Sequence, residues 1–204
     1  MYAVGHLGLG YLVTRLFYRS TNLNVALILT LSILPDIDVI IPFLPHRGPT
    51  HSIVVFFAIF VASLIYEKGK YTPYMVSYAS HLISDVFTGS YYGGTQLLWP
   101  LSSKWFPFDP KLIMGSTFEA SIETLFMVSA IVILLLMKDY RNLAEFNYGN
   151  FLLFLPCGAV LASLFFGYYL RGNIFPETLF YPHLFLSIVF MAAIGNNLIK
   201  FRSV

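Results

Sequence analysis

The stretch LPDIDVIIPFLPHRGPTHS, residues 34–52, carries much of the polar chemistry of a chain that is otherwise dominated by hydrocarbon side chains. Two carboxylates, two imidazoles and one guanidinium lie within it, on Asp36, Asp38, His46, His51 and Arg47. Neither an apolar core nor a bilayer favours such a density of polar groups. The stretch is therefore either a metal site that performs chemistry or a solvated loop that happens to be rich in histidine.

The amino-acid composition indicates whether the rest of the chain lies in water or in a lipid bilayer. Of the 204 residues, 57% are apolar and only 11% are charged, whereas soluble domains are roughly 25% charged. The mean hydropathy of +0.73 agrees, and the sequence predicts an integral membrane protein. A net charge of +2 with dispersed basic residues excludes a nucleic-acid surface. The one cysteine, Cys157, excludes an internal disulfide.

Apolar segments near the length of a membrane span recur along the whole chain. A bilayer helix needs about 20 residues, and we expect an all-α polytopic protein with seven such helices, or six if one short segment does not cross. We also expect a single membrane-embedded domain over 1–204, in which 1–120 bears the metal site and 121–204 is helical scaffold. The predicted spans are residues 2–18, 22–41, 51–66, 73–88, 117–137, 149–170 and 179–199.

Lysine and arginine predict the orientation in the membrane. With the amino terminus outside and seven alternating spans, eight of the twelve basic residues fall on the inner side, as the positive-inside rule prefers. The sequence thus predicts a multi-pass plasma (inner) membrane protein. The same orientation brings the polar candidates to one level at the outer face, namely His6, Asp36, Asp38, His46, His51, His81, Asp85, Glu119 and Glu123.

The spacing within two polar pairs, Asp36 with Asp38 and His81 with Asp85, predicts which way their side chains face. Pro35 disfavours a helical Leu34, so we expect the second helix to end there. Asp36 and Asp38 then lie two apart in an extended segment, and both carboxylates face one side. Such acids could also be an ordinary solvated loop. His81 and Asp85, four apart in SHLISD, share a helical face and could hold one ion, or form only an intramembrane hydrogen-bonded pair.

The remaining polar residues have two interpretations each. Pro49 is suited to open the third helix, and the positive end of that helix with Arg47 would suit a phosphate. Glu119 and Glu123 are four apart at the start of a helix, where acids often serve only as partners of the helix dipole. His6 alone is equally consistent with packing and with metal binding.

Five motifs in order resemble the YdjM-like family of membrane-bound metal-dependent hydrolases. They are GHLGLG, LPDID, HRGPTHS, SHLISD and GGTQLLWPLS, and the likeness covers residues 1–120. The resemblance implies an inner-membrane hydrolase with a histidine and aspartate metal site. A more remote likeness to zinc-dependent phospholipases C and single-strand nucleases implies phosphoester cleavage. This chain has five histidines and a single His-x-x-x-Asp element, so one or two ions are expected rather than three.

The types of residue present also support one or two metal ions, and they suggest a role for each candidate side chain. Mixed nitrogen and oxygen ligands suit zinc first, with manganese or iron as alternatives. An uncoordinated carboxylate, from Asp38 or Glu119, could accept a proton from water, and Arg47 could hold a phosphate oxygen. The expected substrate is a membrane lipid or a lipid-linked phosphoester. The expected metal ligands are His6, Asp36, His46, His51, His81 and Asp85.

Two questions stay open at the level of sequence. Residues 89–116 form a long, aromatic-rich connection that is either a lid over the site or an interfacial anchor. The same histidine and aspartate cluster could serve a metal or proton transporter or channel, or stabilise a protein without activity. A transporter site is usually near the middle of the bilayer, whereas these candidates gather at helix ends, which favours the hydrolase.

Overall fold

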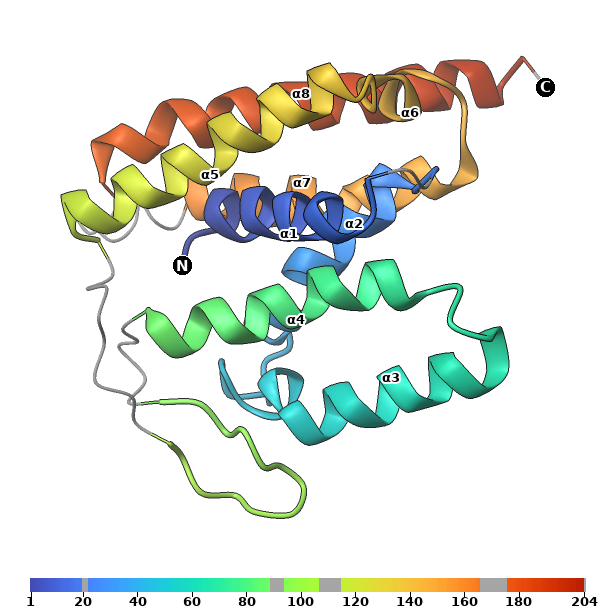
Figure 1. Ribbon diagram of the computed structural model, residues 1–204. Helices are drawn as coiled ribbons and strands as arrows, with labels where there is room; N and C mark the ends of the chain where they lie inside the picture. Colours follow the sequence, from blue (N-terminus) through green and yellow to red (C-terminus); the bar gives the residue numbers. More distant parts are fainter. Residues whose placement is uncertain (20–21, 89–93, 107–114, 166–175, 204) are drawn as a thin grey trace.

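The computed structural model describes residues 1–19, 22–88, 94–106, 115–165 and 176–203, and the chain is all-α over these residues (Figure 1). Eight α-helices occur there: α1 (Ala3–Phe17), α2 (Val25–Ile33), α3 (Ile53–Glu67), α4 (Thr72–Phe87), α5 (Thr117–Leu136), α6 (Tyr140–Ala144), α7 (Phe154–Ala162) and α8 (Glu177–Phe201). Three 3-10 helices complete the order: η1 (Leu34–Ile40), η2 (Pro49–His51) and η3 (Tyr148–Leu153). The predicted all-helical class is confirmed.

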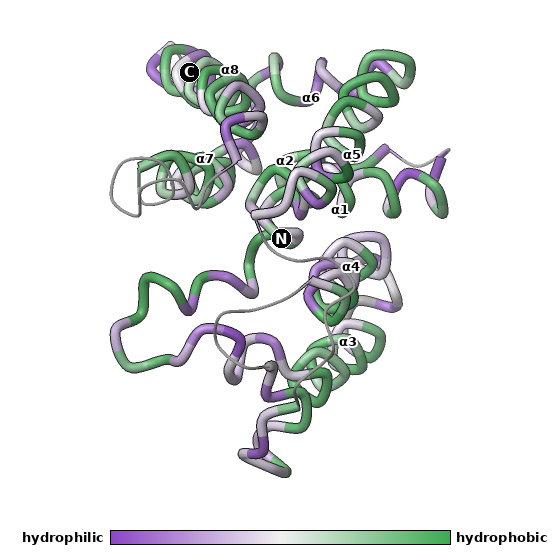
Figure 2. Tube along the Cα trace, turned by 90° about the vertical axis from the view of Figure 1, so that its left-hand side faces the viewer, coloured by the Kyte–Doolittle hydropathy of each residue, from purple (hydrophilic) through white to green (hydrophobic). Residues whose placement is uncertain are grey.

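The longer helices lie side by side in layers. In Figure 1, α5 and α8 form the upper layer, α1, α2 and α7 the middle one, and α4 and α3 lie below. Viewed along the helices, α1 and α2 are enclosed between α5 on one side and α4 on the other (Figure 2). The core follows this arrangement, because the largest fully buried apolar side chains include Leu7 and Tyr11 of α1 and Ile28 of α2.

Three helical stretches of the described chain are long and apolar enough to cross a bilayer: Thr117–Leu136, Tyr148–Phe165 and Glu177–Phe201. The prediction of seven spans is thus confirmed only in part. The apolar α3 and the enclosed helices α1, α2 and α4 have 9 to 16 residues, fewer than the roughly 20 that a spanning helix needs. The predicted span 22–41 is shortened most, since the α-helix stops at Ile33 and a 3-10 helix continues through Pro35.

Glycine allows the first helix to pack closely on its neighbours. A Cβ added at Gly8 would lie 2.8 Å from the backbone nitrogen of Met127 in α5, a separation that real Cβ atoms do not tolerate. Only a residue without a side chain permits this approach of two helix backbones, as in other membrane helix pairs. The motif GHLGLG is therefore a packing element as well as the carrier of His6.

Polar caps position the ends of the helices near the 34–52 stretch. Ser52 caps α3, with its hydroxyl oxygen accepting from the backbone nitrogen of Val54 at 3.1 Å. Ser116 caps α5 in the same way at the nitrogen of Glu119. Both are the side-chain caps that helix starts favour. At the opposite end of α1, Arg15 forms a buried ion pair with Asp139 at 2.6 Å.

Candidate metal site

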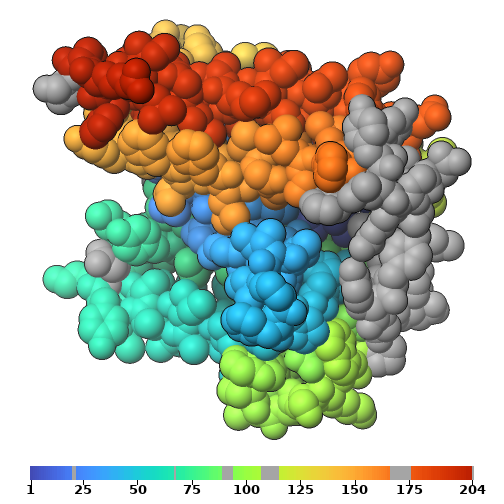
Figure 3. All heavy atoms as spheres, turned by 180° about the vertical axis from the view of Figure 1, so that it is seen from behind, coloured from blue at the N-terminus to red at the C-terminus, as the bar shows by residue number. Residues whose placement is uncertain are grey.

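The 34–52 stretch folds against α4, whose His81 and Asp85 contact His51 and Arg47. Seen from behind, the light-blue surface of the η1 segment lies between the orange α7 above and the lime 94–106 segment below (Figure 3). The backbone of 94–106 is tied to this stretch, since the nitrogen of Gln96 donates to the carbonyl of Arg47 at 3.0 Å. The nitrogen of Ile53 likewise donates to the carbonyl of Leu97 at 3.0 Å. These bonds fix the turn that presents His46 and His51.

The expected extended conformation of Asp36 and Asp38 is wrong. Both lie in the 3-10 helix η1, and Leu34 before the proline is right-handed helical, with φ −57° and ψ −37°. Pro35 sits in the first turn of η1, where its fixed φ and missing N–H are tolerated. The two carboxylates nevertheless both reach His51, because they approach opposite nitrogens of its ring. Pro49 opens the short helix η2, and α3 begins only at Ile53.

Four side chains converge on one point: those of Asp36, His51, His81 and Asp85. His51 Nε2 lies 3.4 Å from Asp36 Oδ1 and 3.3 Å from Asp85 Oδ2. His81 Nε2 lies 3.1 Å from His51 Nε2, 3.4 Å from Asp36 Oδ1 and 3.7 Å from Asp85 Oδ2. Four ligands around one zinc at bonds of about 2.0–2.1 Å stand about 3.3–3.4 Å apart. The observed separations therefore match a tetrahedral site.

The outer nitrogens of the two histidines determine which atoms face this point. His81 Nδ1 lies 2.7 Å from the carbonyl oxygen of Ser32, which can only accept, so Nδ1 carries the proton. His51 Nδ1 lies 3.3 Å from Asp38 Oδ2 and 3.1 Å from Thr50 Oγ1. With both Nδ1 atoms bound on the outside, the inner Nε2 atoms are the ones that can ligate an ion, and they face each other and two carboxylates. Such a set of acceptors needs a cation, and the residues fit a divalent metal.

Asp38 is a buried support for the two histidines around it. Its Oδ1 accepts from His46 Nδ1 at 2.9 Å, and its Oδ2 accepts from Thr50 Oγ1 at 2.7 Å and from the Arg47 backbone at 3.1 Å. Asp38, His46 and His51 form a second group of possible ligands. That group shares His51 with the first but uses the nitrogen that faces away from it. Asp38 thus resembles the carboxylate that orients a metal-bound histidine.

Arg47 is buried against Asp85 rather than exposed to a ligand. Its NH2 lies 3.1 Å from Asp85 Oδ1, and its NH1 donates to the carbonyls of Asp85 and Thr88 at 3.0 and 3.1 Å. The backbone of Arg47 is left-handed, with φ 62°, and its side chain is only 4% exposed. These contacts support a role in positioning Asp85, and the expected contact with a phosphate stays a prediction.

His6 and Glu119 lie beside the cluster but in neither group of possible ligands. The His6 ring stacks on that of His81 at 3.7 Å between centroids, and its Nε2 lies 3.3 Å from Asp85 Oδ1. Glu119 Oε2 accepts from the backbone nitrogen of Gly115 at 2.6 Å, and Glu123 Oε1 from that of Tyr2 at 2.8 Å. The two glutamates therefore bind backbone at the starts of α5 and α1, as their interpretation as helix-end partners predicts.

The charges around His51 and Asp38 explain the protonation of both residues, which face each other at His51 Nδ1 and Asp38 Oδ2. Burial alone would lower the pKa of His51, but the surrounding carboxylates, first that of Asp36, hold this pKa well above 6.5. Burial would raise the pKa of Asp38, but hydrogen bonds from His46 and His51 lower it to about 2. Without an ion, the proton of His51 supplies the positive charge that the carboxylates require.

Sequence reasoning did not single out Thr50, Thr88 or the carbonyl of Ser32. All three bind the charged residues from the outside: Thr50 the carboxylate of Asp38, Thr88 the guanidinium of Arg47, and Ser32 the ring of His81. Thr50 had a local signal, since it precedes His51 directly. The contacts of Ser32 and Thr88 join positions 49 and 41 residues apart, for which the sequence carries no sign.

These features define an all-α membrane protein with a buried histidine and aspartate cluster that can bind a metal ion. Residues 1–174 match the family model described as YdjM inner membrane protein, so the chain belongs to the YdjM inner membrane protein family. No curated protein and no solved structure matches the chain significantly. The resemblance carried by the five motifs is confirmed, and the match extends beyond residue 120.

Proposed function

We propose that the protein is a metal-dependent hydrolase that cleaves a phosphoester of a lipid or lipid-linked substrate at the outer membrane face. The observation that carries this proposal is the convergence of Asp36, His51, His81 and Asp85 with tetrahedral separations. Zinc is the ion that best suits two imidazoles and two carboxylates. An ion held there would supply Lewis acidity and, with a water as an additional ligand, would lower the pKa of that water to about 7.

Exposure indicates from which side a substrate reaches the cluster. The side chains of Asp36 and His46 are 21% and 22% exposed, whereas those of His51 and His81 are fully buried. Next to Asp36 along the chain, Val39, Ile40 and Phe43 are exposed. Partly exposed polar side chains bordered by exposed apolar ones suit a molecule with a charged head and a hydrocarbon tail. This arrangement supports a lipid substrate.

Of these two partly exposed side chains, His46 is the better placed to move a proton. Its Nδ1 donates to Asp38 Oδ1 at 2.9 Å, which fixes the orientation of the ring. Asp38 itself is buried and has both oxygens bound, which supports an orienting role over the expected role as proton acceptor. In this proposal Arg47 holds Asp85 in place, and His46 exchanges the proton of water or of the leaving group.

The test uses the full chain in detergent, loaded with zinc and assayed with bis(p-nitrophenyl) phosphate and with phosphatidylethanolamine in mixed micelles. We expect cleavage of at least one ester, with a loss of about 100-fold or more in Asp85→Asn and His51→Gln, because each removes a metal ligand. His183→Gln is the matched control: this histidine is also buried, but it binds the carbonyl of Leu179 in its own helix at 2.8 Å.

The competing function is transport of a metal ion or of protons through the same cluster. It is distinguished by reconstituting the same preparations into vesicles and following zinc uptake and internal pH. Uptake without cleavage of either ester would contradict the hydrolase. Cleavage without uptake supports it.

A further inference from the structure

An apolar cavity of about 450 Å³ lies apart from the metal cluster, between α5 and α8 on one side and α1 on the other. Viewed along the helices, α5 and α8 are separated above α1 (Figure 2). The lining residues that matter most below are Ala130, Leu134, Tyr140, Phe185, Ala193 and Asn196. The polar side chains of the lining are those of Tyr11, Tyr140 and Asn196, and the Tyr11 hydroxyl donates to Asp139, the neighbour of Tyr140.

The surroundings of the cavity favour a hydrocarbon chain as its occupant. Both α5 and α8 are long and apolar enough to cross a bilayer, so hydrocarbon chains would surround them there. Water would find almost no hydrogen-bond partners against this lining. Along α8 the cavity extends from Phe185 to Asn196, which is roughly 16 Å at about 1.5 Å per residue. One leaflet of the hydrocarbon core is about 15 Å thick, so the length suits one acyl chain.

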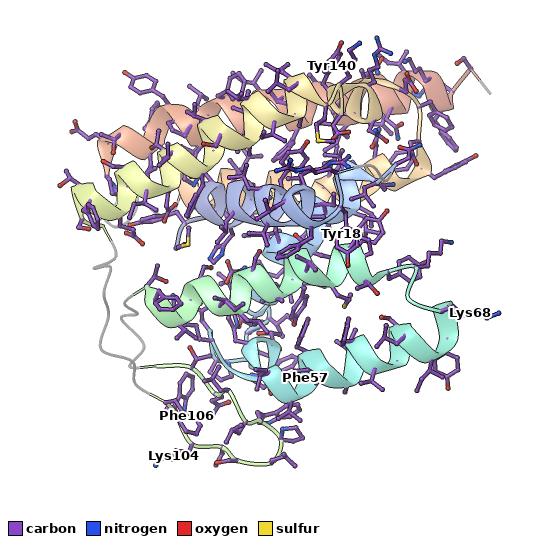
Figure 4. The ribbon with its side chains drawn as sticks, in the orientation of Figure 1. Tyr18, Phe57, Lys68, Lys104, Phe106 and Tyr140 are labelled. Atoms are coloured by element: carbon purple, nitrogen blue, oxygen red, sulfur yellow. The ribbon has the colours of Figure 1, made fainter. Side chains whose placement is uncertain are left out.

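The end with the polar side chains is also bordered by basic residues. Lys138 and Arg141 are exposed on either side of Tyr140, which Figure 4 labels on α6 beside the end of α5. Lys200 donates from Nζ to the carbonyl oxygen of Ala144 at 2.9 Å, and Asn196 donates to the same oxygen at 2.6 Å. Ala144 itself lines the cavity, so this ammonium lies at its rim.

Acidic residues at this end do not cancel that charge. Asp139 is buried in its ion pair with Arg15. Glu145 is the other acid near Tyr140, and it is exposed. One exposed acid is thus outnumbered by the three cations Lys138, Arg141 and Lys200. Basic side chains at the membrane surface attract anionic headgroups, and an exposed tyrosine such as Tyr140 is typical of that depth.

We infer that this cavity binds one acyl chain of an anionic phospholipid whose phosphate contacts Lys138, Arg141 and Lys200. The basic end of the cavity, at Lys138, Arg141 and Lys200, lies by the ends of α5 and α8, whereas the metal cluster lies near the start of α1, where the Met1 amino group is 3.3 Å from Asp85 Oδ1. The lipid of this cavity is therefore a bound component of the fold and not the substrate proposed above, and the inference does not depend on the hydrolase activity.

The test measures lipid bound to the full chain by native mass spectrometry in detergent, with dioleoyl phosphatidylglycerol and dioleoyl phosphatidylcholine added separately. We expect preferential binding of phosphatidylglycerol. Changing Lys138, Arg141 and Lys200 to Gln should reduce that preference by about fivefold per charge. Lys68→Gln and Lys70→Gln, which lie in the turn between α3 and α4, are the control and should leave the preference unchanged.

A second pair of variants tests whether the cavity holds the acyl chain of the lipid. Ala193→Phe fills the cavity and should abolish binding of both lipids, whereas Met191→Phe adds the same ring at an exposed position of α8 and should not. Thermal melting of each variant separates loss of lipid from loss of fold. Equal binding of the two lipids by the wild type would overturn the inference. So would a dimer that Ala193→Phe dissociates, because a second copy would then occupy the cavity.

Discussion

His51 Nε2 and His81 Nε2 lie 3.1 Å apart in the interior of the bundle, with the carboxylates of Asp36 and Asp85 on either side. The two rings come from different segments, the end of η2 and the middle of α4. The Ser32 carbonyl holds the outer nitrogen of one ring and Asp38 holds that of the other. The inner nitrogens thus point at each other before any ligand arrives, which is a site built for a cation.

The substitution Asp38→Asn tests how much of that arrangement depends on the supporting carboxylate. An amide at this position can donate as well as accept, so it no longer selects the protonated Nδ1 of His51. We expect zinc affinity to fall by about 10- to 100-fold, measured by competition with a chromogenic chelator. Thr50→Val removes one hydrogen bond to the same carboxylate and should cost less. An unchanged affinity in Asp38→Asn would show that Asp38 does not orient the ligand.

The dependence of zinc affinity on pH has a defined sign. Because the neighbouring carboxylates raise the pKa of His51 above 6.5 in the metal-free protein, the ion must displace a proton below that raised pKa. Affinity should therefore fall as the pH is lowered from 8 to 5.5, approaching about tenfold per pH unit for one displaced proton. Calorimetry in buffers of different ionisation enthalpy counts the protons released. Zinc binding with no proton release throughout this range contradicts the assignment of His51 as ligand.

The close packing of α1 on α5 makes Gly8 a sensitive position. In Gly8→Ala the new Cβ would lie 2.8 Å from the backbone of Met127, and the two helices must separate. We expect a loss of about 1–3 kcal/mol, seen as a lower melting temperature in detergent. Gly195→Ala is the matched control, because a Cβ there meets nothing within 4 Å. Equal melting temperatures for the two variants would show that the contact at Gly8 is not required.

The sequence predicted those parts of the site that depend on local periodicity. His81 and Asp85, four apart on one helix, do face the same ion position, as the spacing indicates. Asp36 and Asp38 were expected in an extended segment because of Pro35, yet proline is equally suited to the first turn of a 3-10 helix. Composition indicated a membrane protein, but it did not show that enclosed helices such as α2 are too short to span.

Tertiary contacts explain what the sequence could not predict. The guanidinium of Arg47 crosses to Thr88 and Asp85, 41 and 38 residues away, and its expected contact with a phosphate stays a prediction. The His6 ring stacks on that of His81, and its expected role as a metal ligand also stays a prediction. Of the 89–116 connection, the described part places Leu98, Trp99 and Leu101 at the surface, in agreement with an interfacial anchor; residues 89–93 and 107–114 lie outside the described residues.

The most direct measurement is the zinc content of the purified full chain, determined by elemental analysis after dialysis and combined with anomalous scattering from crystals. We expect one ion per chain bound between Asp36, His51, His81 and Asp85, absent from Asp85→Asn and retained in His183→Gln. A metal-free protein after zinc loading, or an ion bound elsewhere and undisturbed by Asp85→Asn, would contradict this metal site.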